Sequence, residues 1–191
     1  MIEIRVSWST QLAPHTLGER HAAFPGPQAT GTDEFDAGSV HVILQTQGDL
    51  AGYGRLTIGG PGVFNTWTQG RAGLPAGHAV ADLGRCFITP AFRRRELFGP
   101  LCASAMMIAR SLGCSVVNGA CIPGRRILET LADVGFVPHN SAVQEQEPNG
   151  NVVQIQPLTC NDLERPALAL SRFESQLAEQ GLVLSLAAGH D

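Results

Sequence analysis

Apolar and polar positions alternate along some segments of this chain and recur at helical spacing along others. Ile2 to Trp8 alternates as IEIRVSW, which predicts a first strand. Ser39 to Thr46 and Leu50 to Ile58 are two further strand-like segments joined by a short Gln-Gly-Asp turn, so they predict an antiparallel hairpin. Thr10 to Phe24 precedes this hairpin and predicts a helix, which we expect to begin near Pro14 because proline suits a first helical turn.

The segment from Ala79 to Gly113 predicts a strand, an arginine-rich connection and then a helix. The strand is mostly apolar and ends at Thr89, because the following Pro90 has no backbone N–H to donate to a sheet. Gly99-Pro100 suits a helix start, and Gly113 stands where a glycine often ends a helix. One face of that helix carries Leu97, Leu101, Ser104, Ile108 and Leu112.

The C-terminal part of the chain continues the mixture of elements. Ser115 to Cys121 predicts a strand, and Arg125 to Val134 predicts a helix that ends at Gly135. Residues 136–146 and 151–157 flank a Glu-Pro-Asn-Gly turn and predict a final hairpin. Asn161 to Gln180 predicts a terminal helix with Asn161 as its N-cap.

This order of elements predicts an α+β fold with a mixed central sheet. Residues 1–180 are expected to form one domain, and residues 181–191 a frayed tail. The chain has 191 residues, of which 43% are apolar and 16% charged, a composition typical of a globular protein. No run approaches 18 apolar residues and the N-terminus lacks the layout of a signal peptide, so we expect a soluble, cytoplasmic protein without membrane association.

Positive charge is concentrated around the central strand and helix. Residues 81–130 carry seven arginines and three acids, a net charge of +4, whereas the whole chain carries −4. Arg93, Arg94 and Arg95 lie just before a helix N-terminus, where N–H groups and the helix dipole favour an anion such as phosphate. A solvated turn is the other interpretation of such a run. One compact basic patch on an acidic chain argues against extended nucleic-acid binding.

Residue usage excludes several kinds of chemistry. The chain has no lysine, so Schiff-base formation and a lysine general base are excluded. The five cysteines include no Cys-x-x-Cys pair, and we interpret them as small buried hydrophobic residues. The six histidines show no metal-ligand spacing, so we predict no metal site. We also expect no permanently bound cofactor. Cys121 is rejected as a nucleophile because no histidine is positioned to activate it.

The element order, with an arginine loop and helix after the fourth strand, resembles the GNAT superfamily of acyltransferases. Individual residues resemble one branch of it, the acyl-homoserine-lactone synthases and related N-acyl amino acid synthases. Asp82-Leu83-Gly84-Arg85 is similar to the strand motif of that branch, and the other matching residues are Arg20, Phe24, Asp33, Asp36, Arg55 and Phe64. The resemblance covers roughly residues 15–160. It implies a GNAT-like, mostly antiparallel sheet flanked by helices.

The resemblance also implies the donor. GNAT phosphate loops carry glycines that let backbone N–H groups approach a pyrophosphate, and here the run reads Arg93-Arg94-Arg95-Glu96-Leu97-Phe98. The lost glycines favour the single phosphate of an acyl-carrier-protein arm over coenzyme A. We therefore expect acyl-ACP or acyl-CoA as co-substrate, held by the three arginines, with acyl carrier protein as a partner.

Asp82 and Arg85 are the candidate catalytic residues. Amide formation from a thioester needs a proton acceptor, and Asp82 is the candidate; a salt bridge with Arg85 or Arg55 is the alternative. On a regular strand Asp82 and Arg85 point to opposite faces, and the resemblance implies a bulge that reorients one of them.

The resemblance implies that Arg20, Asp33, Asp36 and Arg55 form one buried ion cluster that shapes the acceptor pocket. The two acids either fix a substrate ammonium or cap the next element and pair with the arginines. Phe24 and Phe64, with Trp67, are plausible pocket walls or ordinary core residues.

Three functions stay open on the sequence. The first is an N-acyltransferase that moves an acyl group from a phosphopantetheine thioester to a small amino-acid-type amine by direct attack. The second is an acyl-homoserine-lactone synthase-like reaction with S-adenosylmethionine as the amine. The third, from another class, is a non-catalytic module that binds acyl thioesters.

Overall fold

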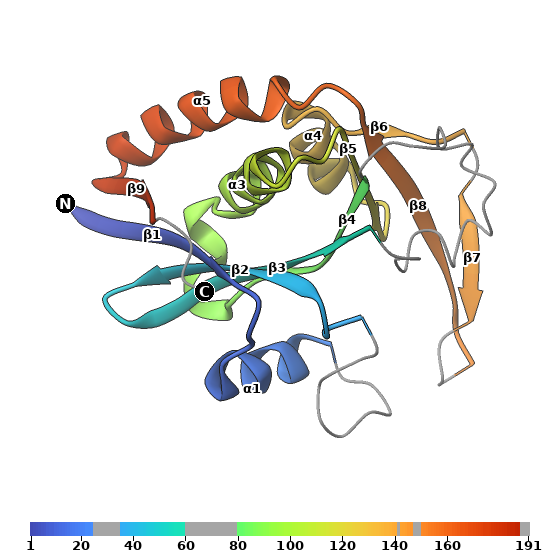
Figure 1. Ribbon diagram of the computed structural model, residues 1–191, viewed down its shortest axis with the longest axis horizontal. Coiled ribbons are helices and arrows are strands. Elements are labelled where there is room, and N and C mark those ends of the chain that lie inside the picture. The colour runs from blue at the N-terminus through green and yellow to red at the C-terminus, as the bar shows by residue number, and fades with distance from the viewer. Residues whose placement is uncertain (25–34, 60–79, 141, 147–149, 188–191) are drawn as a thin grey trace.

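The computed structural model describes residues 1–24, 35–59, 80–140, 142–146 and 150–187, and Figure 1 shows how their helices and strands are arranged. In chain order the elements are β1 (Ile2–Ser9), α1 (Pro14–Ala23), β2 (Ser39–Thr46), β3 (Asp49–Ile58), β4 (Val80–Ile88), the 3₁₀ helix η1 (Pro90–Arg95), α3 (Phe98–Ser111), β5 (Val116–Cys121), α4 (Arg125–Asp133), β6 (Val137–Pro138), β7 (Val143–Gln146), β8 (Val152–Cys160), α5 (Arg165–Glu179) and β9 (Leu182–Leu186).

The strands form one mixed sheet in the order β6-β8-β5-β4-β3-β2-β1-β9, and β7 pairs with β8 outside this path. Most neighbours are antiparallel; the parallel pairs are β4 with β5 and β1 with β9. The β2–β3 hairpin turns at Gln47 and Gly48, both with positive φ, as a tight turn between twisted strands requires. The expectation of a mixed, mostly antiparallel sheet flanked by helices is confirmed.

Helices cover the two faces of the sheet unequally. Figure 1 shows α3 and α5 on one side of the central strands and α1 on the other, and α3 also packs against α4 and α5. Helix α3 is apolar on most of its surface, so it is buried along most of its length. Gly99 in its first turn lies against Phe173 of α5, and a Cβ atom at Gly99 would come within 2.5 Å of that ring. This close approach explains why the second residue of α3 is a glycine.

The central strands direct consecutive residues to opposite faces. The face toward α3 carries Leu56 and Leu83, which lie in the main hydrophobic core. The face toward α1 carries their sequence neighbours Arg55 and Asp82, which are 2% and 8% exposed. Asn118 of β5 is paired with Asp82 and extends this polar face. The central strands therefore supply both an apolar core and a buried polar surface.

The C-terminal tail corrects one expectation. Residues 182–186 form strand β9, which pairs in parallel with β1, instead of fraying. Leu182 is 2% exposed, and Gly181, with φ of +74°, lets the chain reverse direction directly after α5. The alternating sequence Leu-Val-Leu-Ser-Leu thus completes the edge of the sheet.

The expected final helix and hairpin are also adjusted. Helix α5 begins at Arg165, not at Asn161, because Pro166 occupies its first turn and the Asp162 carboxylate accepts the N–H of Glu164 at 3.1 Å. Residues 136–146 form two short strands, β6 and β7, which both pair with β8, rather than one strand. At 15 residues α5 is the longest described helix, and no helix in the described part of the chain is long and apolar enough to cross a membrane.

Candidate functional site

Strand β4 contains a bulge opposite Gly54 of β3. Arg55 pairs with Gly84 and Tyr53 with Phe87, so the two residues Arg85 and Cys86 face a single residue of β3. Arg85 adopts φ of 54°, a left-handed conformation that occurs in one class of β-bulge. The bulge that the family resemblance implied is present in this strand.

The bulge places Arg85 on the same face as Asp82. The Arg85 guanidinium carbon lies 5.4 Å from the ring centre of Phe24, which follows α1, so Arg85 faces the α1 side. Cys86 instead lies beside Leu83 on the α3 side, since both contact the position where a Gly54 side chain would stand. Without the extra residue, Asp82 and Arg85 would point to opposite faces.

Strands β4 and β5 part at the bulge. Their parallel pairing runs from Val80 with Val116 to Leu83 with Gly119 and then stops, while β5 continues to pair with β8 through Cys121. Among the described residues, β4 is therefore not paired with β5 beyond Leu83.

Asp82 lies just before this opening. Burial raises the pKa of its carboxyl to about 6, although a hydrogen bond from Asn118 and the positive charge of Arg55 act to lower it. The Asn118 amide donates to Asp82 Oδ1 at 3.3 Å. The second oxygen, Oδ2, is buried and has no hydrogen-bond partner in the described part of the chain. A carboxylate of this kind is ionised at neutral pH and still a usable proton acceptor.

Arg20, Asp36 and Arg55 form a buried ion cluster. Arg20 binds both carboxylate oxygens of Asp36 at 2.6 Å, and Arg55 Nη1 binds Oδ1 at 2.9 Å. Burial acts to lower the pKa of Arg20, but its hydrogen bonds to Asp36 and Tyr53 outweigh that effect and raise the pKa above the usual value. The Arg55 guanidinium carbon also lies 5.6 Å from the ring centre of Phe35. Asp36 thus pairs with Arg20 and Arg55, as expected.

Tyr53 and His41 continue the cluster along the hairpin. Arg20 donates to Tyr53 Oη at 3.2 Å, so the phenol hydrogen is directed to His41 Nδ1, 2.8 Å away. Burial raises the pKa of Tyr53 to about 12 and lowers that of His41, so both groups are neutral at neutral pH. Phe24 stacks edge-on against Phe87, with ring centres 5.9 Å apart. Aromatic rings therefore border the ion cluster on one side.

The three loop arginines are exposed and lie between β4 and α3. Arg93 Nε donates to the carbonyl of Ile88 at 3.4 Å, and η1 holds Arg94 and Arg95 in the following turn. Glu96, with φ of 56°, ends η1 and pairs with Arg126 of α4 at 2.7 Å. The sequence predicted this arrangement of a strand, an arginine turn and a helix, and the described residues contain it.

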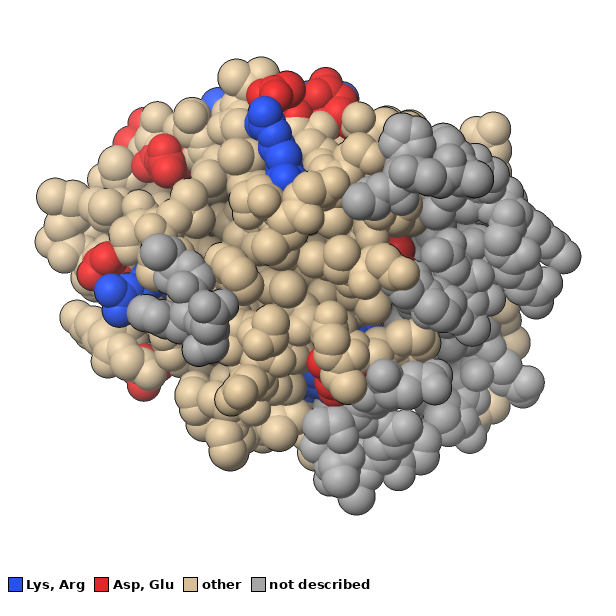
Figure 2. Space-filling view, viewed as in Figure 1, with Lys and Arg blue, Asp and Glu red and all other residues tan. Residues whose placement is uncertain are grey.

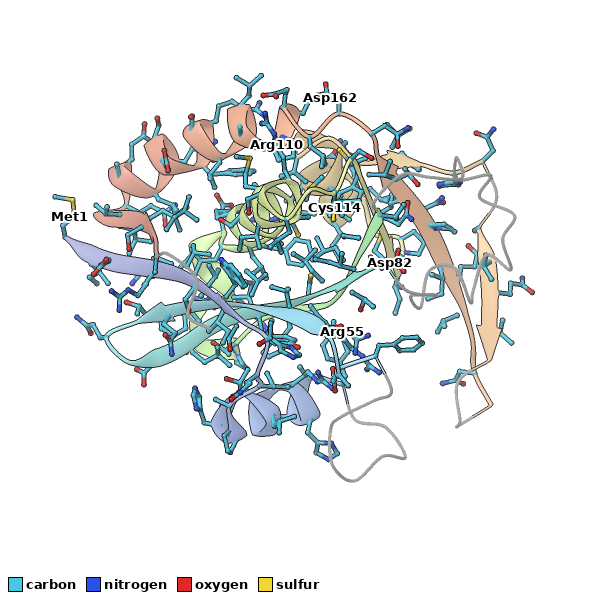
Figure 3. All side chains as sticks on the ribbon, in the orientation of Figure 1. Met1, Arg55, Asp82, Arg110, Cys114 and Asp162 are labelled. Carbon is cyan, nitrogen blue, oxygen red and sulfur yellow. The ribbon has the colours of Figure 1, made fainter. Side chains whose placement is uncertain are left out.

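Two predicted acceptor-pocket residues, Asp33 and Phe64, lie outside the described residues, as does Trp67. Figure 3 shows Arg55 between the central strands and α1 and Asp82 at the end of these strands, both away from Arg110 and Asp162 beside α5. The face turned to the viewer in Figure 2 shows few charged side chains among its described residues.

Comparison with known proteins supports this architecture. No protein-family model matches the sequence, and no curated protein matches it either. Among solved structures, the CoA-dependent acyl-homoserine lactone synthase BjaI, determined with MTA, is similar with a TM-score of 0.65 and 13% identity, over 98% of this chain and 95% of that one. TofI, in a ternary complex with an inhibitor and MTA, is similar with a TM-score of 0.62 and 15% identity, over 87% and 96%.

An acetyltransferase of Bacillus subtilis in complex with CoA is similar with a TM-score of 0.60 and 12% identity, over 84% of this chain and 99% of that one. The protein has the GNAT fold. At these identities the likeness concerns the fold, which confirms the expected architecture.

Several polar residues of this GNAT-fold site were not predicted from the sequence. His41, Tyr53 and Asn118 are each at most 1% exposed and connect to the predicted residues by hydrogen bonds. The sequence contained a pattern that could have identified them, because each is a polar or partly polar residue within an otherwise apolar strand segment. A buried polar residue in a strand needs a partner, and that requirement points to a site.

Proposed function

We propose that this protein is an N-acyltransferase that moves an acyl group from a phosphopantetheine thioester to the amine of a small, amino-acid-type acceptor by direct attack. The observation that carries the proposal is the buried Asp82, whose pKa is raised to about 6, placed where β4 and β5 part. The fold, which is shared with acyl-homoserine lactone synthases and acetyltransferases, supports the same reaction class.

The donor side of the site is the opening between β4 and β5 together with the arginine turn. The amide groups of a pantetheine arm are proposed to bind where the pairing of β4 with β5 ends, and Arg93, Arg94 and Arg95 supply positive charge for its phosphate. Because these arginines are exposed, they suit a phosphate that arrives on a carrier protein as well as one on CoA. We propose acyl-ACP or acyl-CoA as co-substrate.

The acceptor side is the polar face beside the ion cluster. Arg20, Asp36 and Arg55 bring charges of both signs close to Asp82, which suits an acceptor with an ammonium and a carboxylate group. Gly84 has no described atom within 4 Å of the place where a Cβ would stand, so this face has room next to Arg55. Phe24 and Phe64 are proposed as pocket walls, and Asp33 as a further acid of the cluster.

In the proposed reaction the neutral amine nitrogen attacks the thioester carbonyl carbon. A C–N bond forms, the C–S bond breaks, and the pantetheine sulfur leaves as a thiolate. The acceptor's ammonium first releases one proton to solvent and so becomes the neutral amine. Asp82, directly or through a water molecule, accepts the second proton that the nitrogen loses on forming the amide and returns it to the thiolate, which departs as the free thiol. Arg85, held on the same face by the bulge, is proposed to stabilise the negative charge that develops on the carbonyl oxygen.

S-adenosylmethionine is the second candidate acceptor. The observation in its favour is that BjaI, which is similar in fold over most of the chain, was also determined with SAM and isopentyl-CoA. S-adenosylmethionine is itself an amino acid, so its ammonium and carboxylate groups would make the same contacts as those of an ordinary amino acid. The two candidate acceptors differ only in their side chains.

The test is mass spectrometry of the purified protein incubated with acyl-ACP or acyl-CoA and a panel of α-amino acids and S-adenosylmethionine. We expect an N-acylated product with at least one amine and an equal amount of free thiol. Tight binding of acyl thioester without acylation of any amine would overturn the enzymatic proposal and leave a non-catalytic acyl-thioester-binding module.

A further inference from the structure

A chain of hydrogen bonds runs from Asp82 across two strands to a histidine. Asn118 Nδ2 lies 3.3 Å from Asp82 Oδ1, and Thr159 Oγ1 lies 3.0 Å from Asn118 Oδ1. His139 Nε2 lies 2.7 Å from the same Thr159 oxygen. The four residues come from β4, β5, β8 and the segment after β6, so the chain exists only in the folded sheet.

The chemistry of the four groups fixes the direction of every bond in this chain. An ionised carboxylate only accepts, so the Asn118 NH₂ group must face Asp82 and its carbonyl must face Thr159. The Thr159 hydroxyl therefore donates to Asn118, and its oxygen accepts from His139 Nε2–H. All donors thus point toward Asp82, which is the arrangement that stabilises a negative charge there.

His139 is held by its backbone as well as by its ring. Its N–H donates to the carbonyl of Pro157 at 2.9 Å, and Gln156 Nε2 donates to its carbonyl at 2.8 Å. Asn118 is fully buried, so its side chain has little freedom to turn away from Asp82. The chain is therefore anchored at both ends.

We propose that Asn118, Thr159 and His139 are positioning residues that hold the Asp82 carboxylate by Oδ1 and leave Oδ2 to accept the amine proton. This inference deepens the proposed acyl transfer and rests on it for the role of Asp82. The hydrogen bond from Asn118 favours the ionised carboxylate, while burial favours the protonated one. From β3, the positive charge of Arg55 also faces Asp82; Asn118 and Thr159 on the other side are neutral.

The test measures the ionisation of Asp82 directly and does not need a substrate. Carboxyl ¹³C shifts of the labelled protein are followed against pH, with Asp82→Asn identifying the Asp82 signal. Asn118→Leu should raise the pKa of Asp82 by roughly one pH unit, because a hydrogen bond to a charged group is lost. Thr159→Val and His139→Phe should raise it by successively smaller amounts.

Matched variants separate positioning from simple structural damage. Thr57 of β3 is the cross-strand neighbour of Asp82 on its other side, and its hydroxyl bonds Ser39 at 3.0 Å instead of joining the chain. Thr57→Val should therefore leave the pKa of Asp82 unchanged. Thr159→Ser keeps a hydroxyl and His139→Gln keeps a side-chain N–H donor. In both variants the pKa of Asp82 should therefore stay close to its wild-type value.

Once an acceptor that the protein acylates has been identified, kinetics give a second readout. Thr159→Val should lower kcat and move the acidic limb of the pH–rate profile to higher pH, with both KM values unchanged. An unchanged Asp82 pKa in folded Asn118→Leu and Thr159→Val would overturn the inference, whatever the protein catalyses. If the pKa shifts occur and Asp82→Asn still acylates at the wild-type rate, the positioning of Asp82 stands but its role as proton acceptor fails.

Discussion

The two faces of the central sheet are built from the same strands but are held together by different forces. On the α3 side, Leu56 and Leu83 are buried among other apolar side chains, and their contribution to stability comes from removal of apolar surface from water. On the α1 side, Arg55 and Asp82 are almost equally buried, but burial of a charge is unfavourable unless partners compensate for it. One face of the sheet stabilises the fold, and the other contains the proposed chemistry.

The two faces also differ in how completely their buried groups are paired, and the incompletely paired group is the one with the proposed function. The carboxylate of Asp36 compensates the buried positive charges of Arg20 and Arg55. Asp82 Oδ2, in contrast, receives no hydrogen bond from any described residue. The raised pKa of Asp82 expresses that incomplete compensation. Changes at Asp82 should therefore lower activity without lowering stability, and changes on the apolar face should lower stability without changing substrate affinity. Changes in the paired ion cluster should affect both stability and acceptor affinity.

The largest effect is expected from Asp82→Asn. Removal of a general base should lower turnover by about 10²–10⁴-fold while the fold is retained, because the amide preserves the shape of the side chain and the bond from Asn118. Steady-state kinetics at pH 7.5 with circular dichroism as the folding control measures this. Turnover close to wild type would reduce Asp82 to a structural residue.

The same variant should show the cost of the buried charge. The folded-state pKa of about 6 lies above the ordinary aspartate value of 3.8, so the folded protein holds this proton more tightly than the unfolded chain. The favourable contribution is present below about pH 3.8 and is lost as the pH rises through 6. Asp82→Asn should therefore raise the free energy of unfolding at pH 8 by at most about 3 kcal/mol, and change it less at pH 4. Thermal unfolding at the two pH values measures this. Equal changes at both pH values would contradict this assignment.

Asp36→Asn and Leu56→Ala compare the two faces directly. Loss of the Asp36 charge leaves Arg20 and Arg55 buried without it and should destabilise the fold by about 3–5 kcal/mol. Leu56→Ala leaves a cavity on the apolar face and should cost about 2–5 kcal/mol. Urea unfolding measures both.

Kinetics then separate the two variants. At a temperature where both are folded, Asp36→Asn should raise the acceptor KM more than the donor KM, whereas Leu56→Ala should change neither. Similar acceptor KM values in the two variants would remove the ion cluster from the acceptor pocket.

A smaller effect is expected at the arginine turn. Arg93→Ala or Arg95→Ala should raise the donor KM by about two- to tenfold and reduce its dependence on salt, because an exposed phosphate contact is screened by ions. Arg110→Ala is the control: Arg110 is also exposed and pairs with Glu164 near α5, away from the opening between β4 and β5. An unchanged salt dependence in both loop variants would exclude a phosphate contact at this turn.

The smallest change is the addition of one methyl group. Gly84→Ala should alter the acceptor KM with little effect on stability, because no described atom lies within 4 Å of the new Cβ and the φ angle of Gly84 is not positive. Gly18→Ala on the exposed part of α1 meets the same open space and should leave kinetics unchanged. Equal kinetics in the two variants would place the acceptor away from Gly84.

The sequence by itself determined the elements and their order, because local spacing decides them. Two strand-like segments joined by a Gln-Gly-Asp turn predicted β2 and β3, and the Pro90 and Gly113 boundaries predicted the ends of β4 and α3 closely. It also identified Asp82, Arg20, Asp36 and Arg55, as polar residues that match a family pattern. The tail 182–186 was misjudged because a short alternating segment becomes a strand only when a partner edge, here β1, is available.

Only the tertiary structure decided what these residues do to one another. The bulge at Arg85 depends on how β3 and β4 pair, and it alone determines that Arg85 shares a face with Asp82. The raised pKa of Asp82 depends on how completely the fold removes water, which no local pattern contains. The chain from Asp82 to His139 joins residues 36, 41 and 20 positions apart, and such contacts arise only when the sheet places those strands side by side.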